Sequence, residues 1–258
     1  MTRRASERGA RLVVWPESAL PFYFDTTPTV ARELKDLARH LSVDLLFGND
    51  DEEEEGDGSS RFFVGAKMLD PSGELSLRYH KIHLVPFGEY VPLQGLLRKR
   101  GVGKLVQQVS DFSPGEAYTL GSVDGHPIGA FICYEGIFPD LVRRFSAGGA
   151  ELLVNITNDA WYGRTSAPYQ HFSTLVFRAV ENRKFLVRAA NTGISAVIDP
   201  RGRVLEKTGL FEETVLVRDV RFVSGRTFYA AHGDVFAWGC LVLTVLLCLY
   251  PSPGRKTR

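Results

Sequence analysis

One cysteine stands where a reactive thiol would be useful. Cys133 ends the apolar run PIGAFIC and precedes the short YEG segment. A nucleophile at the carboxyl end of a strand, just before a turn, lies where α/β sheets usually open to ligands. The position suits an unreactive core cysteine equally well, because free cysteine is among the most buried residue types.

Two further residues could serve such a thiol. Glu17 lies in WPESALP, where prolines on both sides stiffen the loop and fix the direction of the carboxylate. Lys81 lies in YHKIHLVPFGEYVP, and Glu89 follows in the same segment, which is rich in proline and glycine. Taken alone, the local sequence predicts that Glu17 is an exposed loop residue and that Lys81 is an ordinary lysine at a strand end.

The elements that must position these side chains alternate between strands and helices. We expect strands over 12–15, 44–47, 61–69, 74–79, 127–133, 151–157, 185–190, 195–198 and 214–217. We expect helices over 29–41, 138–147 and 167–184. This alternation predicts an α/β layered domain, and turn signals at 70–73 and 199–202 indicate that the sheets are not purely parallel.

Composition narrows the class of protein. The chain has 258 residues, of which 44% are hydrophobic, and this is enough to form a large core in one or two domains. Its formal net charge is +1. The charge balance and the lack of a basic stripe with interleaved aromatics give no indication of nucleic-acid binding. The acidic run DDEEEE, 50–55, predicts a solvated loop, because like charges at this density repel.

The cysteine count and the two ends of the chain carry further information. Cys133, Cys240 and Cys248 are odd in number and two lie in an apolar tail, so we expect free thiols.

The N-terminus has a basic start without an apolar stretch of signal-peptide length. Residues 235–250 carry no charge, have aromatics near both ends and precede a basic tail at 251–258, which predicts a transmembrane helix with a cytoplasmic C-terminus. A buried core helix is the alternative.

Four segments together resemble one family. They are WPESALPFY, YHKIHLVPFGEYVPL, ICYEGIFPDLVRR and the long stretch that begins NDAWYGRTSAPYQHF, and they span residues 13 to about 204. In content and order they resemble the catalytic domain of the apolipoprotein N-acyltransferase family, a branch of the carbon-nitrogen hydrolase (nitrilase) superfamily. The resemblance implies a four-layer α-β-β-α sandwich, followed here by the predicted transmembrane helix.

The resemblance also implies domain limits and a catalytic triad. We expect an N-terminal tail over 1–10, a catalytic domain over 11–225, a linker over 226–234, and the helix and tail beyond. Cys133 would be the nucleophile, Glu17 the general base and acid, and Lys81 the cation that stabilises the oxyanion. Supporting roles fall on Glu89, Tyr134 and Glu135, and a substrate pocket is expected around Asn158, Trp161 and Tyr162.

The implied reaction moves a fatty acyl chain from a membrane phospholipid to Cys133 as a thioester. The α-amine of a diacylglyceryl-cysteine lipoprotein then takes the chain, at the periplasmic face of the bacterial inner membrane. This chemistry calls for no cofactor and no metal. His80 and His83 are spaced for metal binding, but no carboxylate or cysteine cluster accompanies them.

Two other readings stay open. An amidase or nitrilase would use the same triad and let water resolve the thioester, and a non-catalytic membrane or scaffold protein could share the fold. Members of the family normally carry several membrane helices ahead of this domain. The resemblance therefore implies a fragment, a mis-chosen start codon or a split gene, and a chain that accepts Cys-directed acyl probes but transfers acyl groups poorly alone.

Overall fold

Two β-sheets packed face to face form the centre of the molecule in the computed structural model, which describes residues 1–56, 58–92 and 111–250. The four-stranded sheet has the order β1 (Leu12–Val14), β2 (Asp44–Gly48), β5 (Gly65–Leu69), β6 (Leu75–His80). The six-stranded sheet has the order β12 (Val204–Lys207), β11 (Ala196–Ile198), β10 (Phe185–Asn191), β9 (Leu152–Asn158), β8 (His126–Ile132), β7 (Leu120–Val123).

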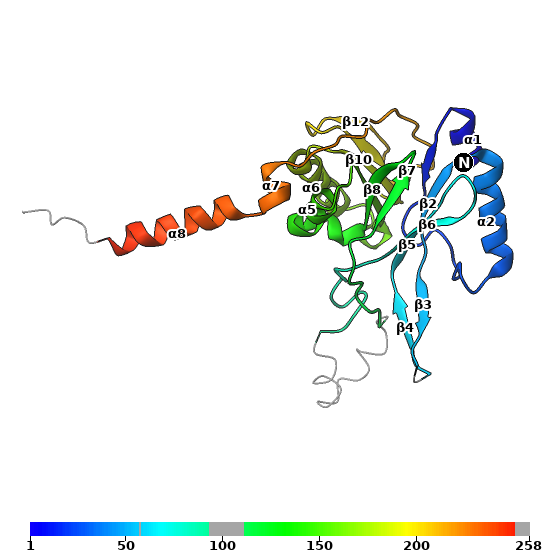
Figure 1. Ribbon diagram of the computed structural model, residues 1–258, viewed down its shortest axis with the longest axis horizontal. Coiled ribbons are helices and arrows are strands. Elements are labelled where there is room, and N and C mark those ends of the chain that lie inside the picture. Colours follow the sequence, from blue (N-terminus) through cyan, green and yellow to red (C-terminus); the bar gives the residue numbers. More distant parts are fainter. Residues whose placement is uncertain (57, 93–110, 251–258) are drawn as a thin grey trace, which may run out of the picture.

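Helices cover the outer faces of both sheets, as Figure 1 shows. On the four-stranded sheet lies α2 (Pro28–Leu41), whose buried Leu34 and Ala38 share a core cluster with residues of β2. On the six-stranded sheet lie α5 (Pro139–Ala147) and α6 (Ala167–Asn182), which bury Phe145 and Leu175 in the main core. The layers therefore follow the order helix, sheet, sheet, helix, as the family resemblance implies.

Three parallel strands bring the site residues predicted on the six-stranded sheet to one edge. Strands β8, β9 and β10 run parallel, and the register pairs Ile132 with Ile156 and Asn191 with Asn158. Their carboxyl ends therefore meet at the same edge of the sheet. Two 3-10 turns follow there, η1 (Cys133–Ile137) after β8 and η2 (Asp159–Tyr162) after β9.

The acidic run is a strand and not the predicted loop, although Glu52, Glu54 and Glu55 are exposed as its charge predicts. It forms β3 (Asp51–Glu54), which pairs with β4 (Ser60–Phe63) in a two-stranded hairpin. Asp51 is only 2% exposed, because Lys67 forms an ion pair with it and His80 lies 2.8 Å away. The charge pattern gave no sign of the buried Lys67, which lies on β5 in the four-stranded sheet.

Other boundaries also differ from the expectations. The predicted strand over 61–69 is two strands, since β4 pairs with the hairpin and β5 joins the four-stranded sheet. Strands β7 and β12 were not expected. The N-terminal tail includes the helix α1 (Thr2–Glu7), whose Thr2 and Ala5 are buried.

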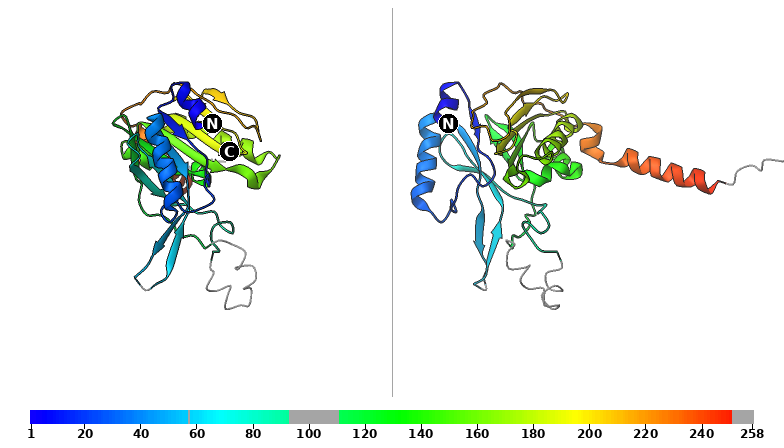
Figure 2. Two further views of the ribbon diagram at one scale, coloured as in Figure 1. Left: turned by 90° about the vertical axis from the view of Figure 1, so that its right-hand side faces the viewer. Right: turned by 180° about the vertical axis from the view of Figure 1, so that it is seen from behind.

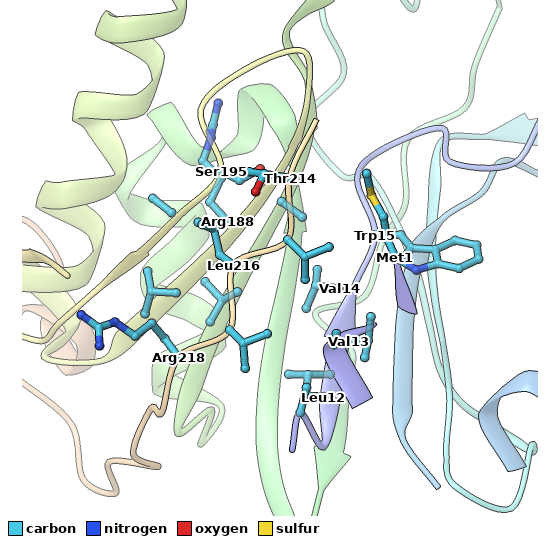
Figure 3. Close-up of a pocket in the computed structure, with 18 of the residues that line it drawn as sticks. Met1, Leu12, Val13, Val14, Trp15, Arg188, Ser195, Thr214, Leu216 and Arg218 are labelled. Carbon is cyan, nitrogen blue, oxygen red and sulfur yellow. The ribbon is translucent and has the colours of Figure 1, made fainter. Parts of the chain in front are cut away.

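The predicted strand over 214–217 is wrong, because the segment forms no ladder. It lines a cavity of about 660 Å³ together with the edge strand β1 and part of β10. Figure 3 shows Thr214 and Leu216 on one side of this cavity and Leu12 to Val14 on the other.

The C-terminal segment projects from the body, as Figures 1 and 2 show. After α7 (Phe228–His232) comes α8 (Val235–Leu249), a helix of 15 residues with none of them buried. At ~1.5 Å per residue this helix is about 22 Å long, whereas a bilayer core is ~30 Å thick. In the part of the chain that the structure describes, no helix is both long and apolar enough to cross a membrane. The predicted transmembrane helix over 235–250 is thus not supported, and the basic tail at 251–258 lies outside the described residues.

Candidate functional site

Cys133 is the first residue after β8 and stands in a strained conformation. Its φ of 50° lies in the left-handed region, which costs a residue other than glycine about 1–2 kcal/mol. The residue is 9% exposed. A cysteine held in this way at a strand end resembles the sharp strand-to-helix turns that expose nucleophiles above a sheet.

Lys81 follows β6 and is fully buried with its charge between two carboxylates. Its Nζ lies 3.4 Å from Oε1 of Glu17 and 2.5 Å from Oε1 of Glu89. The second oxygen of Glu89 accepts a hydrogen bond of 2.9 Å from the backbone N–H of Val85. The loop after β6 therefore folds back so that Glu89 fixes the lysine that precedes it.

Glu17 follows β1 and is held from both sheets. Its Oε2 accepts a hydrogen bond of 2.7 Å from the backbone N–H of Asn158, at the end of β9. Its backbone lies against Gly48 of β2, where a Cβ atom would come within 2.5 Å of the Cα atom of Glu17. Only glycine fits at that position, so the approach of β2 fixes where the carboxylate enters the site.

The electrostatics of the site couple the three residues. Burial raises the pKa of the Cys133 thiol to about 12, the Glu17 carboxylate adds to the rise, and Lys81 opposes it. Burial alone would lower the pKa of Lys81, but Glu17, Cys133 and Glu89 together raise it well above its usual value. The resting site thus combines a protonated thiol with a permanent ammonium group.

Glu135 ties the lysine loop to the cysteine turn. Its carboxylate is fully buried and accepts hydrogen bonds from four donors: the Tyr79 hydroxyl at 2.7 Å and the backbone N–H groups of Ile82 at 2.7 Å, His83 at 3.1 Å and Ile132 at 2.7 Å. Tyr134 packs edge-to-face on Phe138 with ring centroids 5.2 Å apart. Both residues lie where the sequence placed them, in the turn that contains Cys133.

The three expected substrate-binding residues have different environments. Asn158 uses its backbone N–H for Glu17, and its side chain accepts a hydrogen bond of 3.2 Å from Ala160. Trp161 is 88% exposed. Tyr162 is half-buried beside the thiol, and burial followed by the charges of Cys133 and Asp159 raises its pKa. All three belong to the end of β9 or to η2, next to the triad.

Sequence reasoning missed a buried polar cluster beneath Cys133. Asp159 and His171 lie 3.0 Å apart, and Nε2 of His171 lies 3.1 Å from the carbonyl oxygen of Cys133. Arg188 donates to Asp159 at 2.7 Å. The available signal was NDAWYG followed by a histidine on the next helix, but nothing in the spacing linked them to the thiol.

The same cluster offers metal-ligand atoms. Sγ of Cys133, a carboxylate oxygen of Asp159 and a ring nitrogen of His171 all lie within 4.8 Å of one another. However, Nη2 of Arg188 lies 2.7 Å from Asp159 and 3.3 Å from Nδ1 of His171. A divalent cation there would face a guanidinium charge, so hydrogen bonding describes the cluster better than metal binding.

The large cavity of Figure 3 is a separate feature. It is lined by β1, β10 and the segment around 214–220, and none of Glu17, Lys81 and Cys133 is among the described residues that line it. The candidate site is defined by the buried charges and the strained cysteine, and cavity size does not identify it.

Comparison of the sequence with known proteins shows which family the chain matches. The model of the carbon-nitrogen hydrolase family matches residues 1–229. An apolipoprotein N-acyltransferase of Geobacter metallireducens is 50% identical over 242 residues, which are 93% of this chain and 46% of that protein. One from Brucella melitensis is 40% identical over 245 residues, 94% of this chain and 45% of that protein.

The solved structures agree at the level of the fold. An amidase of the nitrilase superfamily from Nesterenkonia superposes with a TM-score of 0.63 at 24% identity, covering 94% of this chain and 87% of the amidase. The chain spans about half the length of the curated relatives named above. With a family match over 1–229 and this shared architecture, the chain belongs to the carbon-nitrogen hydrolase family.

Proposed function

We propose that this chain is the catalytic part of an apolipoprotein N-acyltransferase that acts through Glu17, Lys81 and Cys133. The observation that carries the proposal is the buried contact of Lys81 with Glu17 and Glu89, together with the electrostatic coupling of Lys81 and Glu17 to Cys133. The 50% identical relative that bears this name supports the choice of acyl transfer.

In the first half-reaction Glu17 takes the proton from the Cys133 thiol as the sulfur attacks the carbonyl carbon of a phospholipid ester. Lys81 and the backbone N–H of Tyr134 would stabilise the developing oxyanion, and one such donor is typically worth about 3 kcal/mol in the transition state. When the carbon–oxygen bond breaks, Glu17 returns its proton to the departing alkoxide. A lysophospholipid leaves and the acyl chain stays on sulfur.

In the second half-reaction the α-amine of a diacylglyceryl-cysteine lipoprotein attacks the thioester carbonyl. Glu17 accepts a proton from the amine, the carbon–sulfur bond breaks, and Glu17 passes this proton to the departing Cys133 sulfur, which restores the resting state. The product is an amide-linked lipoprotein. Asn158, Trp161 and Tyr162 lie beside the triad and would contact the acyl chain or the acceptor.

The raised pKa of Cys133 agrees with this sequence of steps. Burial raises the pKa of this thiol to about 12, so little free thiolate forms near pH 7, and a base that takes the proton as the sulfur attacks fits this state. The contact of Glu17 with Lys81 and its effect on the pKa of the thiol support this role. The positive charge of Lys81 then offsets the negative charge that passes from sulfur to oxygen.

We further propose that the chain works against a membrane, at the periplasmic face of the bacterial inner membrane. The donor in the proposed reaction is a phospholipid. Helix α8 carries apolar side chains on every face and leaves them exposed, as in Trp238 at 65% and Leu247 at 66%. A helix of this composition is stable when lipid or protein covers it.

The experiment that tests the proposal follows the fate of the acyl group. The chain is incubated in detergent micelles with phospholipid radiolabelled in the acyl chain and with a synthetic diacylglyceryl lipopeptide. Label in the lipopeptide, lost when Cys133 is replaced by alanine, supports the acyltransferase. Free fatty acid as the only product, at a rate that the lipopeptide does not change, contradicts it and favours the hydrolase that the amidase fold would allow.

A further inference from the structure

The cluster beneath Cys133 contains a cysteine, a histidine and an aspartate, which invites comparison with a Cys-His-Asp triad. In such triads the histidine takes the proton of the nucleophile. His171, Asp159 and Arg188 are all buried and lie on three separate elements, α6, η2 and β10. The proposed mechanism uses none of them, so their role needs its own explanation.

The hydrogen bonds of His171 exclude the role of base. Its Nε2 faces the carbonyl oxygen of Cys133 at 3.1 Å, and a carbonyl oxygen can only accept, so this nitrogen carries a proton. Its Nδ1 lies 3.0 Å from Asp159 and 3.3 Å from Nη2 of Arg188. Neither ring nitrogen therefore has a free lone pair directed at the sulfur.

The other members of the cluster fix the histidine. Asp159 accepts a hydrogen bond of 3.0 Å from Thr157 on the oxygen that meets His171, and one of 2.7 Å from Arg188 on its other oxygen. Arg188 is fully buried and also donates to Asn155 at 2.8 Å. The carboxylate is thus anchored to β9 and β10, and through His171 this anchor reaches the backbone of Cys133.

The backbone that His171 holds is that of Cys133, which has a strained conformation. Cys133 adopts a φ of 50°, which persists only where the surroundings hold it. His171 forms a hydrogen bond with the carbonyl oxygen of Cys133, and Glu135 accepts one of 2.7 Å from the N–H of Ile132, the preceding residue. These two hydrogen bonds on either side of Cys133 fix the direction of its side chain.

We propose that His171, held by Asp159 and Arg188, is a positioning residue that clamps the Cys133 backbone so that its sulfur faces Glu17 and Lys81. The proposal rests on the proposed function for the part that concerns acyl transfer. It predicts that the hydrogen bond to the Cys133 carbonyl matters and that the basicity of the imidazole does not. Glutamine can supply a donor at the position of Nε2, whereas leucine cannot.

The test compares His171→Gln with His171→Leu in a chain whose Cys240 and Cys248 are both replaced by serine, so that Cys133 is the remaining thiol. Phe172→Leu is the matched control, because it trims a buried side chain on the same helix. Folding of each variant is checked by circular dichroism and thermal melting. The two readouts are acylation by a p-nitrophenyl ester and alkylation of Cys133 by iodoacetamide.

We expect His171→Leu to slow both reactions about tenfold, which corresponds to the loss of one hydrogen bond of ~1.4 kcal/mol. His171→Gln and Phe172→Leu should stay within about threefold of the parent, with an unchanged dependence of the acylation rate on pH. Wild-type rates in His171→Leu would overturn the proposal. So would a His171→Gln variant as impaired as His171→Leu, since that result would make the imidazole a base.

Separate measurements distinguish a failure of the proposed function from a failure of the proposed clamp. If Cys133→Ala still forms an acyl adduct, the thioester mechanism is wrong. The iodoacetamide rates of the two His171 variants still decide whether the clamp positions the sulfur, because alkylation requires no acyl donor.

Discussion

The backbone N–H of Ile82 donates a hydrogen bond of 2.7 Å to Oε1 of Glu135, so the lysine loop and the cysteine turn share one buried carboxylate. The other oxygen accepts from Ile132 at 2.7 Å, next to Cys133. The carboxylate of Glu135 therefore links the position of Lys81 directly to that of Cys133. This link joins the two sheets at the edge where the site lies.

Replacing Glu135 with glutamine should destabilise the protein by about 2–3 kcal/mol. One carboxylate oxygen becomes an amide nitrogen that cannot accept, which leaves at least one buried backbone N–H group unpaired. Urea unfolding measures the change, with Glu206→Gln as a control at a partly exposed glutamate that pairs with Arg218. A Glu135→Gln protein as stable as the parent would contradict this account of the link.

Replacing Lys81 with methionine should lower the rate of Cys133 acylation by a factor of about 10²–10³, because the oxyanion loses its cation. The same change should raise the pKa of Cys133 further, since Lys81 opposes the effects of burial and Glu17. Stopped-flow measurement with a p-nitrophenyl ester gives the first quantity, and alkylation rates across pH give the second. An unchanged acylation rate would remove Lys81 from the mechanism.

Replacing Glu17 with glutamine should have opposite effects on acylation and on the free thiol. Acylation should fall by about 10²-fold or more, because the proton acceptor is gone. The pKa of Cys133 should fall below about 12, because Glu17 adds to the effect of burial in raising it. Alkylation of the Cys240→Ser, Cys248→Ser protein at several pH values should level off at a lower pH in the variant. Equal pH profiles would show that the carboxylate and the thiol do not interact.

The buried pair of Asp51 and Lys67 should make stability depend on acid pH. Burial alone would raise the pKa of Asp51, but the hydrogen bond from His80 and the ion pair with Lys67 hold it well below its usual value. A lowered pKa means that this stabilisation is complete above the unfolded pKa of ~3.9 and is lost as pH falls further.

Asp51→Asn should therefore destabilise the protein by about 3 kcal/mol at pH 7, by leaving the Lys67 charge poorly compensated. The difference from wild type should shrink below about pH 4, where the unfolded wild-type aspartate becomes protonated. Urea unfolding between acid and neutral pH measures both effects. The exposed Asp36→Asn serves as control, and a constant difference across this range would argue against the ion pair.

The sequence predicted most elements that carry the site, and the reasons are local. Helices α2 and α6 bury one face, and the periodicity of their apolar residues shows this in the sequence. The strands before Glu17 and Cys133 are visible as apolar runs. The resemblance supplied the sandwich and the triad, which the strand and helix pattern alone would not have singled out. The parallel register of β8 to β10 brings Cys133 and Asn158 to one edge of the six-stranded sheet. Glu17 and Lys81 follow β1 and β6 of the other sheet, so they reach the same site through the packing of the two sheets.

The remaining features depend on contacts between distant residues. The burial of Asp51 at the start of the acidic strand depends on its ion pair with Lys67, 16 residues away in the sequence. The segment over 214–217 has the composition of a strand, but it forms no ladder, and composition cannot show which neighbour is present. The clamp from His171 to Cys133 joins residues 38 apart through a backbone oxygen, which no side-chain pattern reports.

In the proposed mechanism the Cys133 sulfur carries the acyl group. Intact-mass spectrometry after incubation with phospholipid vesicles, followed by peptide mapping, detects this thioester. We expect a mass increase of one acyl chain that maps to Cys133, is reversed by hydroxylamine and is absent in Cys133→Ala. No adduct on the folded protein, or an equal adduct in Cys133→Ala, would rule out a thioester on this cysteine.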